Sequence, residues 1–483
     1  MQEFQLLIGG RAVAARAGAT FDRIDPVTGA VASRSAAATL EDADAAVAAA
    51  AAAFPAWKAL SATQRRKRLN AAADLLDSWT PKFIEIGMAE TGGTPMWYGF
   101  NVMLAANMLR EAAAMTTQIN GEIMPSDIPG SMAMAIRQPA GVVLGIAPWN
   151  APVILGVRAL AMPLACGNTV VLKAAEACPG VHSLIGSALQ ESGLGDGVVN
   201  VITNAPADAP AIVERLIANP AVRRVNFTGS THVGRIIAQL SAKHLKPALL
   251  ELGGKAPFLV LHDADLDEAA ASANFGAFMN QGQICMSTER LVVDQRVAKE
   301  FVAKLAAKAK ALVAGDPRRK DVQLGALVSR EAAARIKSLV DDAVSKGAVL
   351  AAGGQVDGAI MQATVVDGVT PAMKLYAEES FGPVVAVIHA KDEEDAIRLA
   401  NDSPFGLSAA VFSRDIARAL DVAARIESGI CHVNGPTVHD EANMPFGGVK
   451  DSGYGRFGSK AAIAEFTDLR WITVQKTHRH YPI

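Results

Sequence analysis

The sequence predicts an α/β fold built on mostly parallel sheets. Helical and strand-like patterns alternate along the chain, as they do in repeated βα units. The strand-like segments are short and apolar on both faces, which favours sheets that are covered by helices on each side. The length of 483 residues allows roughly three domains at about 150 residues each.

Helices dominate the first part of the chain. Two are expected over 41–59 and 61–77, and Ser61 with Gln64 has the capping-box spacing at the start of the second. Another is expected from about Pro95 to Ala114. Its larger side chains follow one stripe, which consists of Trp97, Asn101, Leu104 and Met108.

Short strands follow, each leading into a helix. The first four are expected over Val142–Ala147, Thr169–Ala174, Val198–Thr203 and Val222–Thr228. After Glu251 come expected strands at 258–261 and 291–294, expected helices at 267–279 and 297–313, and a βα series over about 349–433. The last strand-like segment, 469–475, stands alone, and a lone terminal strand often pairs with a distant segment or another subunit.

The composition excludes several classes of protein. Hydrophobic residues make up 51% of the chain and charged residues 19%, which excludes a disordered chain. The formal charge of −2 gives no field for holding nucleic acid or an anionic membrane surface. Four scattered cysteines without a C-x-x-C pair argue against disulfides and a cysteine zinc site. With no targeting or membrane-spanning segment visible, we expect a cytoplasmic protein.

Nucleotide binding is suggested at a βα junction. In VRRVNFTGSTHVG an apolar strand runs into Gly229 and Ser230, and Gly234 follows in a helix. A helix N-terminus with free backbone N–H groups suits an anion, although an ordinary turn capped by Ser230 explains the segment equally well. The single G-x-G-x-x-G, at 453–458, follows a polar loop and is interpreted as a turn.

A second junction supports a cofactor. Lys173 and Glu176 lie just past the carboxyl end of a predicted strand, where open α/β sheets bind ligands. Lys173 could hydrogen-bond ribose hydroxyls or phosphate. Glu176 could accept a hydrogen bond from a ribose 2′-OH and would repel a 2′-phosphate, which favours NAD over NADP. For an isolated K-x-x-E, a solvated ion pair is the simpler interpretation.

Three residues are candidates for catalysis. Cys285 lies among small and polar residues in NQGQICMSTER, whereas the other cysteines have apolar or helix-start settings. Glu251 ends an apolar run before two glycines, so it is either a paired carboxylate or a base with a raised pKa. The amide of Asn150, at a strand end, could donate to a developing oxyanion.

Together, eight motifs resemble the NAD(P)-dependent aldehyde dehydrogenases over the whole chain. They are PWN at 148–150, K-x-x-E at 173–176, FTGSTHVG at 227–234, LELGGKAP at 250–257, QGQICMSTER at 281–290, EESFGPV at 378–384, SPFGLSAAVF at 403–412 and PFGGVKDSGYGR at 445–456. The stretches ACGNTVVLKAAE, NQGQICMSTERLVVD and HVNGPTVHDEA are most similar to the subgroup that oxidises vanillin, salicylaldehyde and benzaldehyde.

The resemblance implies roles for single residues. Cys285 matches the catalytic cysteine, Glu251 the general base, and Asn150 the side-chain half of the oxyanion hole. The implied cofactor is NAD, with NADP less favoured and no metal. The residues that match cofactor contacts are Trp149, Lys173, Glu176, Gly229, Ser230, Gly234, Glu379 and Phe381.

The resemblance also implies an organisation. The NAD-binding domain, which is Rossmann-like, would comprise 1–120 and 138–250, and an α/β catalytic domain would comprise 251–455. A small β oligomerisation arm would comprise 121–137 and 463–483, in a homodimer or homotetramer. Two positions depart from the family: Arg158 stands where many members have Lys, and Phe457 where some have Glu. The proton route from Glu251 is therefore open, and exchange through water is an alternative.

The implied reaction is NAD-dependent oxidation of an aldehyde through a cysteine thiohemiacetal and thioester, for which an aromatic aldehyde is the expected substrate. Ala151 leaves space beside Asn150, and Trp97 begins a Met-rich helix that could line a flat ring site, although core packing explains the Met stripe better. Arg158 could bind a distal carboxylate, so semialdehydes and aliphatic aldehydes remain alternatives. From other classes, a thiol esterase that needs no NAD and a non-catalytic binding protein remain.

Overall fold

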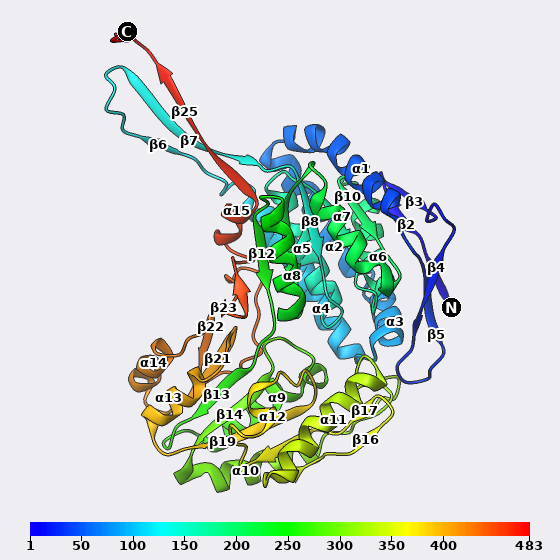
Figure 1. The fold of residues 1–483 in the computed structure, drawn as a ribbon, viewed down its shortest axis with the longest axis vertical. Helices are drawn as coiled ribbons and strands as arrows, with labels where there is room; N and C mark the ends of the chain where they lie inside the picture. The colour runs from blue at the N-terminus through cyan, green and yellow to red at the C-terminus, as the bar shows by residue number, and fades with distance from the viewer.

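The computed structural model describes residues 1–483, and two large sheets form its two main bodies (Figure 1). The first sheet has eight strands in the order β24-β12-β11-β8-β9-β10-β2-β3. Its five central strands pair in parallel: β12 (Ala248–Glu251), β11 (Val222–Thr228), β8 (Val142–Ile146), β9 (Thr169–Lys173) and β10 (Val199–Ile202). The outer strands β2 (Leu6–Ile8), β3 (Arg11–Val13) and β24 (Gly453–Tyr454) pair antiparallel, and β3 and β24 form the two edges.

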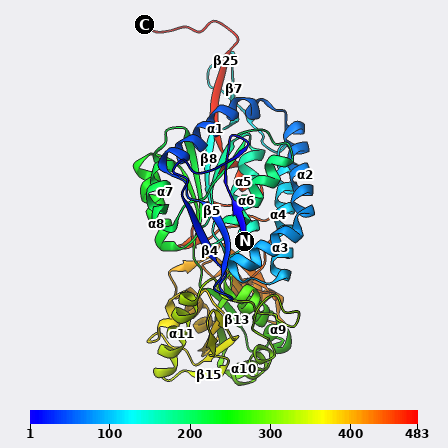
Figure 2. The same ribbon diagram turned by 90° about the vertical axis from the view of Figure 1, so that its right-hand side faces the viewer.

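Helices cover both faces of this sheet, as its apolar strands require (Figure 2). One face carries α1 (Leu40–Ala59), α7 (Ala209–Ala218) and α8 (Thr231–Lys243). The other carries α2 (Ala62–Ser78), α3 (Thr80–Thr91), α4 (Pro95–Met115), α5 (Pro152–Ala165) and α6 (Pro179–Glu191). The predicted capping box of Ser61 and Gln64 is confirmed, and the predicted stripe on α4 is buried.

The second sheet has seven strands in the order β15-β18-β19-β14-β13-β21-β22. All its pairs are parallel except β15 (Val349–Ala352) with β18 (Thr364–Asp367). The others are β13 (Ala256–Val260), β14 (Thr288–Asp294), β19 (Val384–Ala390), β21 (Ser408–Phe412) and β22 (Ile430–Val433). The helices α9 (Leu266–Phe278) and α10 (Gln295–Lys310) pack on one face, and α11 (Arg330–Ser345), α13 (Glu393–Asn401) and α14 (Ile416–Ala424) on the other.

The terminal strand pairs with a distant segment of the same chain, one of the two arrangements expected from the sequence. It is β25 (Thr467–Gln475), and it pairs antiparallel along its full length with β7 (Ser131–Pro139) of the same chain. β6 (Glu122–Met124) completes this three-stranded sheet, which projects from the body as a narrow arm (Figure 2). The outer edges of β6 and β25 have no strand beside them within this chain.

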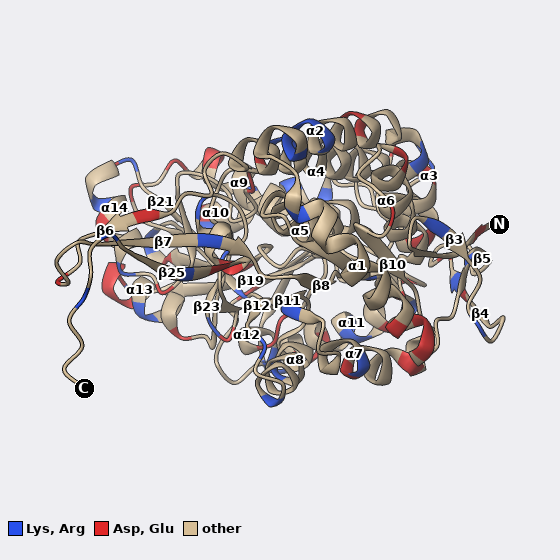
Figure 3. Cartoon of the chain, turned by 90° about the horizontal axis from the view of Figure 1, so that it is seen from above, with Lys and Arg blue, Asp and Glu red and all other residues tan.

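Smaller features complete the fold. The N-terminal sheet β1-β5-β4, made of Gln2–Phe4, Val31–Ala36 and Thr20–Ile24, was not expected from the sequence, and neither was α3. The glycines at 453, 455 and 458 all have positive φ, and β24 pairs antiparallel with β12, which confirms a turn in place of a dinucleotide fingerprint. Acidic and basic residues are interspersed along the chain in Figure 3, as the balanced charge implies. No helix is long and apolar enough to cross a bilayer.

Candidate active site

The register of the first sheet brings three predicted site segments together. Because β8, β11 and β12 run parallel, their carboxyl ends lie along one edge, with Phe227 beside Ile146 and Thr228 beside Glu251. The chain leaves these ends at Asn150, Gly229 and Glu251. The parallel sheet therefore gathers an amide, a glycine turn and a carboxyl group from distant parts of the sequence.

Cys285 reaches the same place from the second sheet, through an unusual loop after α9. Asn280 and Gln281 have φ of 48° and 55°, and Gly282 follows with 68°. Left-handed backbone costs free energy for residues with a Cβ, so tertiary contacts must hold it. Asn280 Nδ2 donates to the Asn150 carbonyl (2.9 Å), and Gln281 Nε2 donates to the Ala326 carbonyl (2.9 Å).

Two cavities meet at Cys285 and Asn150, which line both of them. One, of about 500 Å³, is mostly apolar, and its aromatic side chains are Trp97, Phe100, Phe275 and Phe446. The other, of about 260 Å³, is lined by Trp149, Gly229, Ser230, Glu251, Glu379 and Phe381. The thiol thus lies where an apolar site adjoins a site built from predicted cofactor residues.

Asn150 is held in place by three hydrogen bonds. Its carbonyl accepts from Trp97 Nε1 (3.1 Å) and Asn280 Nδ2, and its own Nδ2 donates to the Gln283 carbonyl (3.0 Å). An amide nitrogen carries two hydrogens, so one remains for an oxygen in the cavity. A fixed donor of this kind stabilises developing negative charge without reorganisation.

Glu251 is a buried carboxyl group with no hydrogen-bond partner on either oxygen. Burial raises its pKa to about 8, against the opposing effects of the Arg158 charge and the nearby Cys285 thiol. Of the two sequence interpretations, the structure therefore favours a base with a raised pKa over a paired carboxylate. Burial and the Glu251 carboxylate also raise the pKa of the Cys285 thiol.

The glycine turn leaves little space for side chains. A Cβ on Gly229 would lie 2.4 Å from the Phe227 ring, and one on Gly234 would lie 2.3 Å from the Leu252 side chain. Ser230 caps α8, since its Oγ accepts a hydrogen bond from the Val233 N–H. The Ser230 cap is therefore confirmed, and the same turn also lines the polar cavity. The close backbone fits a pyrophosphate at the start of a helix.

One side of the polar cavity is held by a buried network of hydrogen bonds. Glu379 accepts from the Gly254 N–H (2.9 Å), and burial with the nearby Glu289 raises its pKa to about 7. Glu289 accepts from the Ser380 and Phe381 N–H groups and pairs with buried Lys255. The Phe381 ring contacts Trp149 edge to face, with centroids 5.7 Å apart. These contacts leave a carboxylate and two rings facing the cavity.

Lys173 and Glu176 form an ion pair with each other, and Asn204 Nδ2 donates to Glu176 (3.1 Å). Lys173 is buried, so this pair is not the solvated one that an isolated motif suggests. The pair follows β9, next to β8 in the sheet, and it does not line the polar cavity. A ligand would have to extend along the sheet edge from Gly229 to reach it.

The residues predicted to line the substrate site, Trp97, Ala151 and Arg158, all line the apolar cavity. The Met residues of α4 contribute little: Met108 packs in the core, and Met96 is the one that lines this cavity. Arg158 pairs with Asp440, and its guanidinium lies 4.2 Å from the centroid of the Phe446 ring and 5.9 Å from that of Phe457. The two departures noted in the sequence are therefore in contact.

Sequence reasoning missed several residues of this site. Asn280 holds the loop that carries Cys285. Glu289 holds the segment that carries Glu379, and Asp440 holds the side chain of Arg158. The partners in each case are 91 or more residues apart in the chain, so no local pattern signals them. In the sequence, only Glu289 in MSTER and Asn280 in the N-Q-G run lie in motifs that could have signalled a role in the site.

Comparisons with known proteins agree with this geometry. Residues 13–472 match the sequence model of the aldehyde dehydrogenase family. The chain is 68% identical to a vanillin dehydrogenase of Pseudomonas fluorescens over 483 residues, with all of both chains covered. It is 50% identical to a salicylaldehyde dehydrogenase of Pseudomonas putida, with 96% of each covered. A crystal structure of a salicylaldehyde dehydrogenase from Pseudomonas putida G7 complexed with salicylaldehyde superposes with a TM-score of 0.98, at 48% identity and full coverage of both chains.

Proposed function

The chain belongs to the aldehyde dehydrogenase family and is an aldehyde-oxidising enzyme. We propose that it oxidises aromatic aldehydes to carboxylic acids with NAD. The observation that carries the proposal is the junction at Cys285, where a cavity lined by aromatic rings meets one lined by Gly229, Glu379 and Phe381. A flat ring suits the first cavity, and the second offers a glycine turn for phosphates.

The first step is attack by Cys285 on the aldehyde carbon. Its thiol keeps its proton in the resting enzyme because burial raises its pKa, so that proton passes to solvent as the thiolate attacks. Both oxygens of Glu251 lack a hydrogen-bond partner, which leaves this carboxyl group available for the later hydrolysis. The new C–S bond gives a thiohemiacetal, whose oxyanion accepts from Asn150 Nδ2 and from the Cys285 backbone N–H.

NAD, when bound, supplies the acceptor for the hydride that leaves this carbon. Glu379 would hold ribose hydroxyls, and Trp149 and Phe381 would fix the ring that faces Cys285. The carbon loses two electrons with that hydride, so a thioester remains on Cys285. Glu251 then takes a proton from water, the resulting hydroxide attacks the thioester, and the acid leaves as the thiol is restored.

Glu176 supports NAD as the preferred cofactor. Its carboxylate is ion-paired with Lys173 at the end of β9, where an adenosine ribose would lie if the pyrophosphate rests at Gly229. A ribose 2′-OH can donate to this carboxylate, whereas a 2′-phosphate would meet its negative charge. The preference for NAD over NADP thus depends on a Glu176 carboxylate oxygen that accepts from the ribose 2′-OH.

The arm supports assembly into a homodimer or homotetramer. Its edge strands β6 and β25 carry exposed apolar side chains, of which Ile123, Leu469 and Trp471 are 78%, 61% and 72% exposed. Open strand edges with apolar side chains favour pairing with another chain. We therefore retain 121–137 with 463–483 as the oligomerisation arm, 1–120 with 138–250 as the NAD-binding domain and 251–455 as the catalytic domain.

Among aldehydes, we place vanillin and related ring-hydroxylated compounds first, followed by salicylaldehyde and benzaldehyde. The similarity to a vanillin dehydrogenase supports this order. Succinate semialdehyde is less suited, because Arg158 is already paired with Asp440 and a distal carboxylate would meet that second negative charge.

The proposal is tested by comparing kcat/KM for five aldehydes, followed as NADH formation. Vanillin, salicylaldehyde and benzaldehyde represent the aromatic class, with succinate semialdehyde and a short aliphatic aldehyde beside them. We expect the aromatic set to be clearly preferred. A preference for either of the last two would contradict the aromatic assignment while leaving the family unaffected.

A further inference from the structure

A buried ion pair interrupts the apolar wall of the substrate cavity. The side chains of Arg158 and Asp440 are 6% and 8% exposed, and both line this cavity. Arg158 contacts Asp440 through Nη2 and Oδ2. Asp440 Oδ1 is buried and has no hydrogen-bond partner. One acceptor of the pair is therefore free, beside the place where a ring would bind.

A free buried acceptor of this kind calls for an explanation. A buried ion pair often stabilises a protein no more than well-packed apolar side chains would, and an unpartnered carboxylate oxygen makes it less favourable. The neighbouring acid, Glu441, already accepts from His439 Nε2 (2.8 Å), so it does not compete for a donor. The cost of leaving Asp440 Oδ1 bare is removed if a ligand supplies the missing donor.

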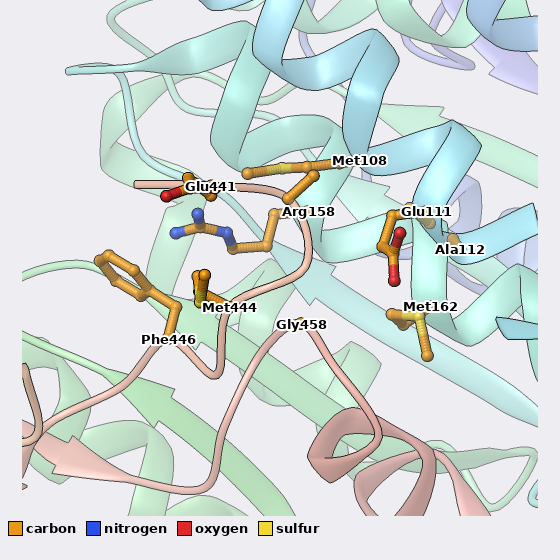
Figure 4. Close-up of a pocket in the computed structure, with 11 residues that line it drawn as sticks. Met108, Glu111, Ala112, Arg158, Met162, Glu441, Met444, Phe446 and Gly458 are labelled. Atoms are coloured by element: carbon orange, nitrogen blue, oxygen red, sulfur yellow. The ribbon is translucent and has the colours of Figure 1, made fainter. Parts of the chain in front are cut away.

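Arg158 also has unused hydrogen-bonding capacity. A guanidinium has five N–H groups, and Arg158 makes one hydrogen bond, to Asp440. Its face packs on Phe446, and Figure 4 shows the side chain passing Met108 with its guanidinium directed toward Phe446 and Glu441, away from Glu111. The pair thus offers an acceptor and donors side by side, which is the combination that binds a hydroxyl group.

The pair makes no hydrogen bond to Glu251 or Cys285, although the Arg158 charge acts on both groups. Arg158 follows Ala151 by seven residues, and seven residues of helix rise by about 10 Å. A long helical side chain leans back toward the N-terminus, which shortens that separation. A guanidinium at that height along the helix therefore suits the far side of a ring whose aldehyde carbon is at Cys285 better than a substituent next to the aldehyde.

We propose that Asp440 and Arg158 form a subsite for a hydroxyl group on the ring carbon opposite the aldehyde. The hydroxyl donates to Asp440 Oδ1, and its oxygen accepts from an Arg158 N–H. The substrates that fit are 4-hydroxybenzaldehydes. This assignment rests on the proposed oxidation of aromatic aldehydes, and it adds the position and the hydrogen-bonding role of one substituent.

The test compares 4-hydroxybenzaldehyde with 4-methoxybenzaldehyde. Both substituents donate electrons to the ring similarly, but the methoxy group has no hydrogen to donate. For the unaltered enzyme we expect kcat/KM to favour the hydroxy compound at least about tenfold, because the methoxy compound leaves a buried acceptor unpaired. 2-Hydroxybenzaldehyde should gain no comparable advantage from the pair.

Asp440→Asn should bring this ratio toward one. In this variant the amide oxygen would stay hydrogen-bonded to Arg158. The amide N–H₂ group would then occupy the place of Oδ1, so the free acceptor would be lost. Glu111→Gln is the matched control, since Glu111 lies near the stem of Arg158 but away from its guanidinium, and it should leave the ratio unchanged (Figure 4). If Asp440→Asn folds poorly, the double variant Arg158→Met with Asp440→Leu removes the pair with apolar side chains, and its ratio should also approach one.

Two results would overturn the subsite: a ratio near one in the unaltered enzyme, or an unchanged ratio in the variants. If the unchanged ratio came with an equal loss of kcat/KM for both substrates, the pair would only support Glu251. A preference for 2-hydroxybenzaldehyde that disappears in Asp440→Asn would overturn the assigned ring position. Failure of the proposed function would look different, because no aromatic aldehyde would then be oxidised efficiently.

Discussion

Glu251→Gln links the electrostatics of the site to the stability of the protein. The pKa of Glu251 is about 8 in the folded protein, against an ordinary value of 4.5. At pH 7 the unfolded chain releases this proton while the folded protein retains it, so folding becomes less favourable as pH rises from 4.5 toward 8. At 1.36 kcal/mol per pH unit, the cost at pH 7 is about 3 kcal/mol.

Glutamine does not titrate, so the variant avoids this cost. We expect the variant's advantage in free energy of unfolding to be larger at pH 7 than at pH 5, where the cost falls to roughly 1 kcal/mol or less. Urea unfolding of both proteins at the two pH values measures the difference. An advantage of equal size at pH 5 and pH 7 would refute the reasoning, because Glu251 would then ionise normally in the folded protein.

The same variant should stop at the thioester, before its first catalytic cycle is complete. Hydride transfer does not need Glu251 once the thiohemiacetal has formed, whereas hydrolysis needs a base for water. Rapid mixing with NAD and vanillin should therefore give a burst of NADH followed by little steady turnover. Steady turnover at the rate of the unaltered enzyme would show that another group deacylates Cys285. In the unaltered enzyme, hydrolysis should rise with pH toward about 8.

The remaining predictions concern the oxyanion, its support and the cofactor. Asn150→Ala should lower kcat by a factor of a hundred or more, since one oxyanion donor contributes about 3 kcal/mol; a change below tenfold would argue against that role. Trp97→Phe removes the 3.1 Å bond to the Asn150 carbonyl and should lower kcat/KM about fivefold for every aldehyde alike. A loss of kcat/KM confined to bulky aldehydes would instead show that Trp97 acts by shaping the substrate cavity. Glu176→Ala should narrow the preference for NAD over NADP, and an unchanged ratio of the two kcat/KM values would show that Glu176 does not set it.

The alternation of βα patterns predicts most of this fold because each buried strand carries its own apolar signal. α3 escapes such an analysis, since it follows α2 after the single residue Trp79 and begins at Thr80-Pro81 with no side-chain cap. The partner of 469–475 escapes it because the pairing strand, β7, lies more than 300 residues earlier. Long-range pairing leaves no local pattern.

In the site, too, local motifs predict some features, and long-range contacts determine the others. Asn150, Glu251 and Cys285 stand in recognisable segments, and parallel pairing is enough to predict that the first two meet. The left-handed loop at Asn280 and Gln281 depends on acceptors at Asn150 and Ala326. Likewise, the pKa of Glu251 depends on its burial in the folded protein. Such properties are set by packing, so a sequence read alone leaves them open.

The most direct test of the central claim is the mass of the trapped intermediate. Glu251→Gln would be incubated with NAD and vanillin, quenched in acid and digested, with Cys285→Ala treated in parallel. We predict that the peptide containing Cys285 gains one vanilloyl group and that the Cys285→Ala protein gains none. An acyl group on Cys166, Cys178 or Cys431, or an unmodified Cys285 despite a burst of NADH, would contradict the mechanism.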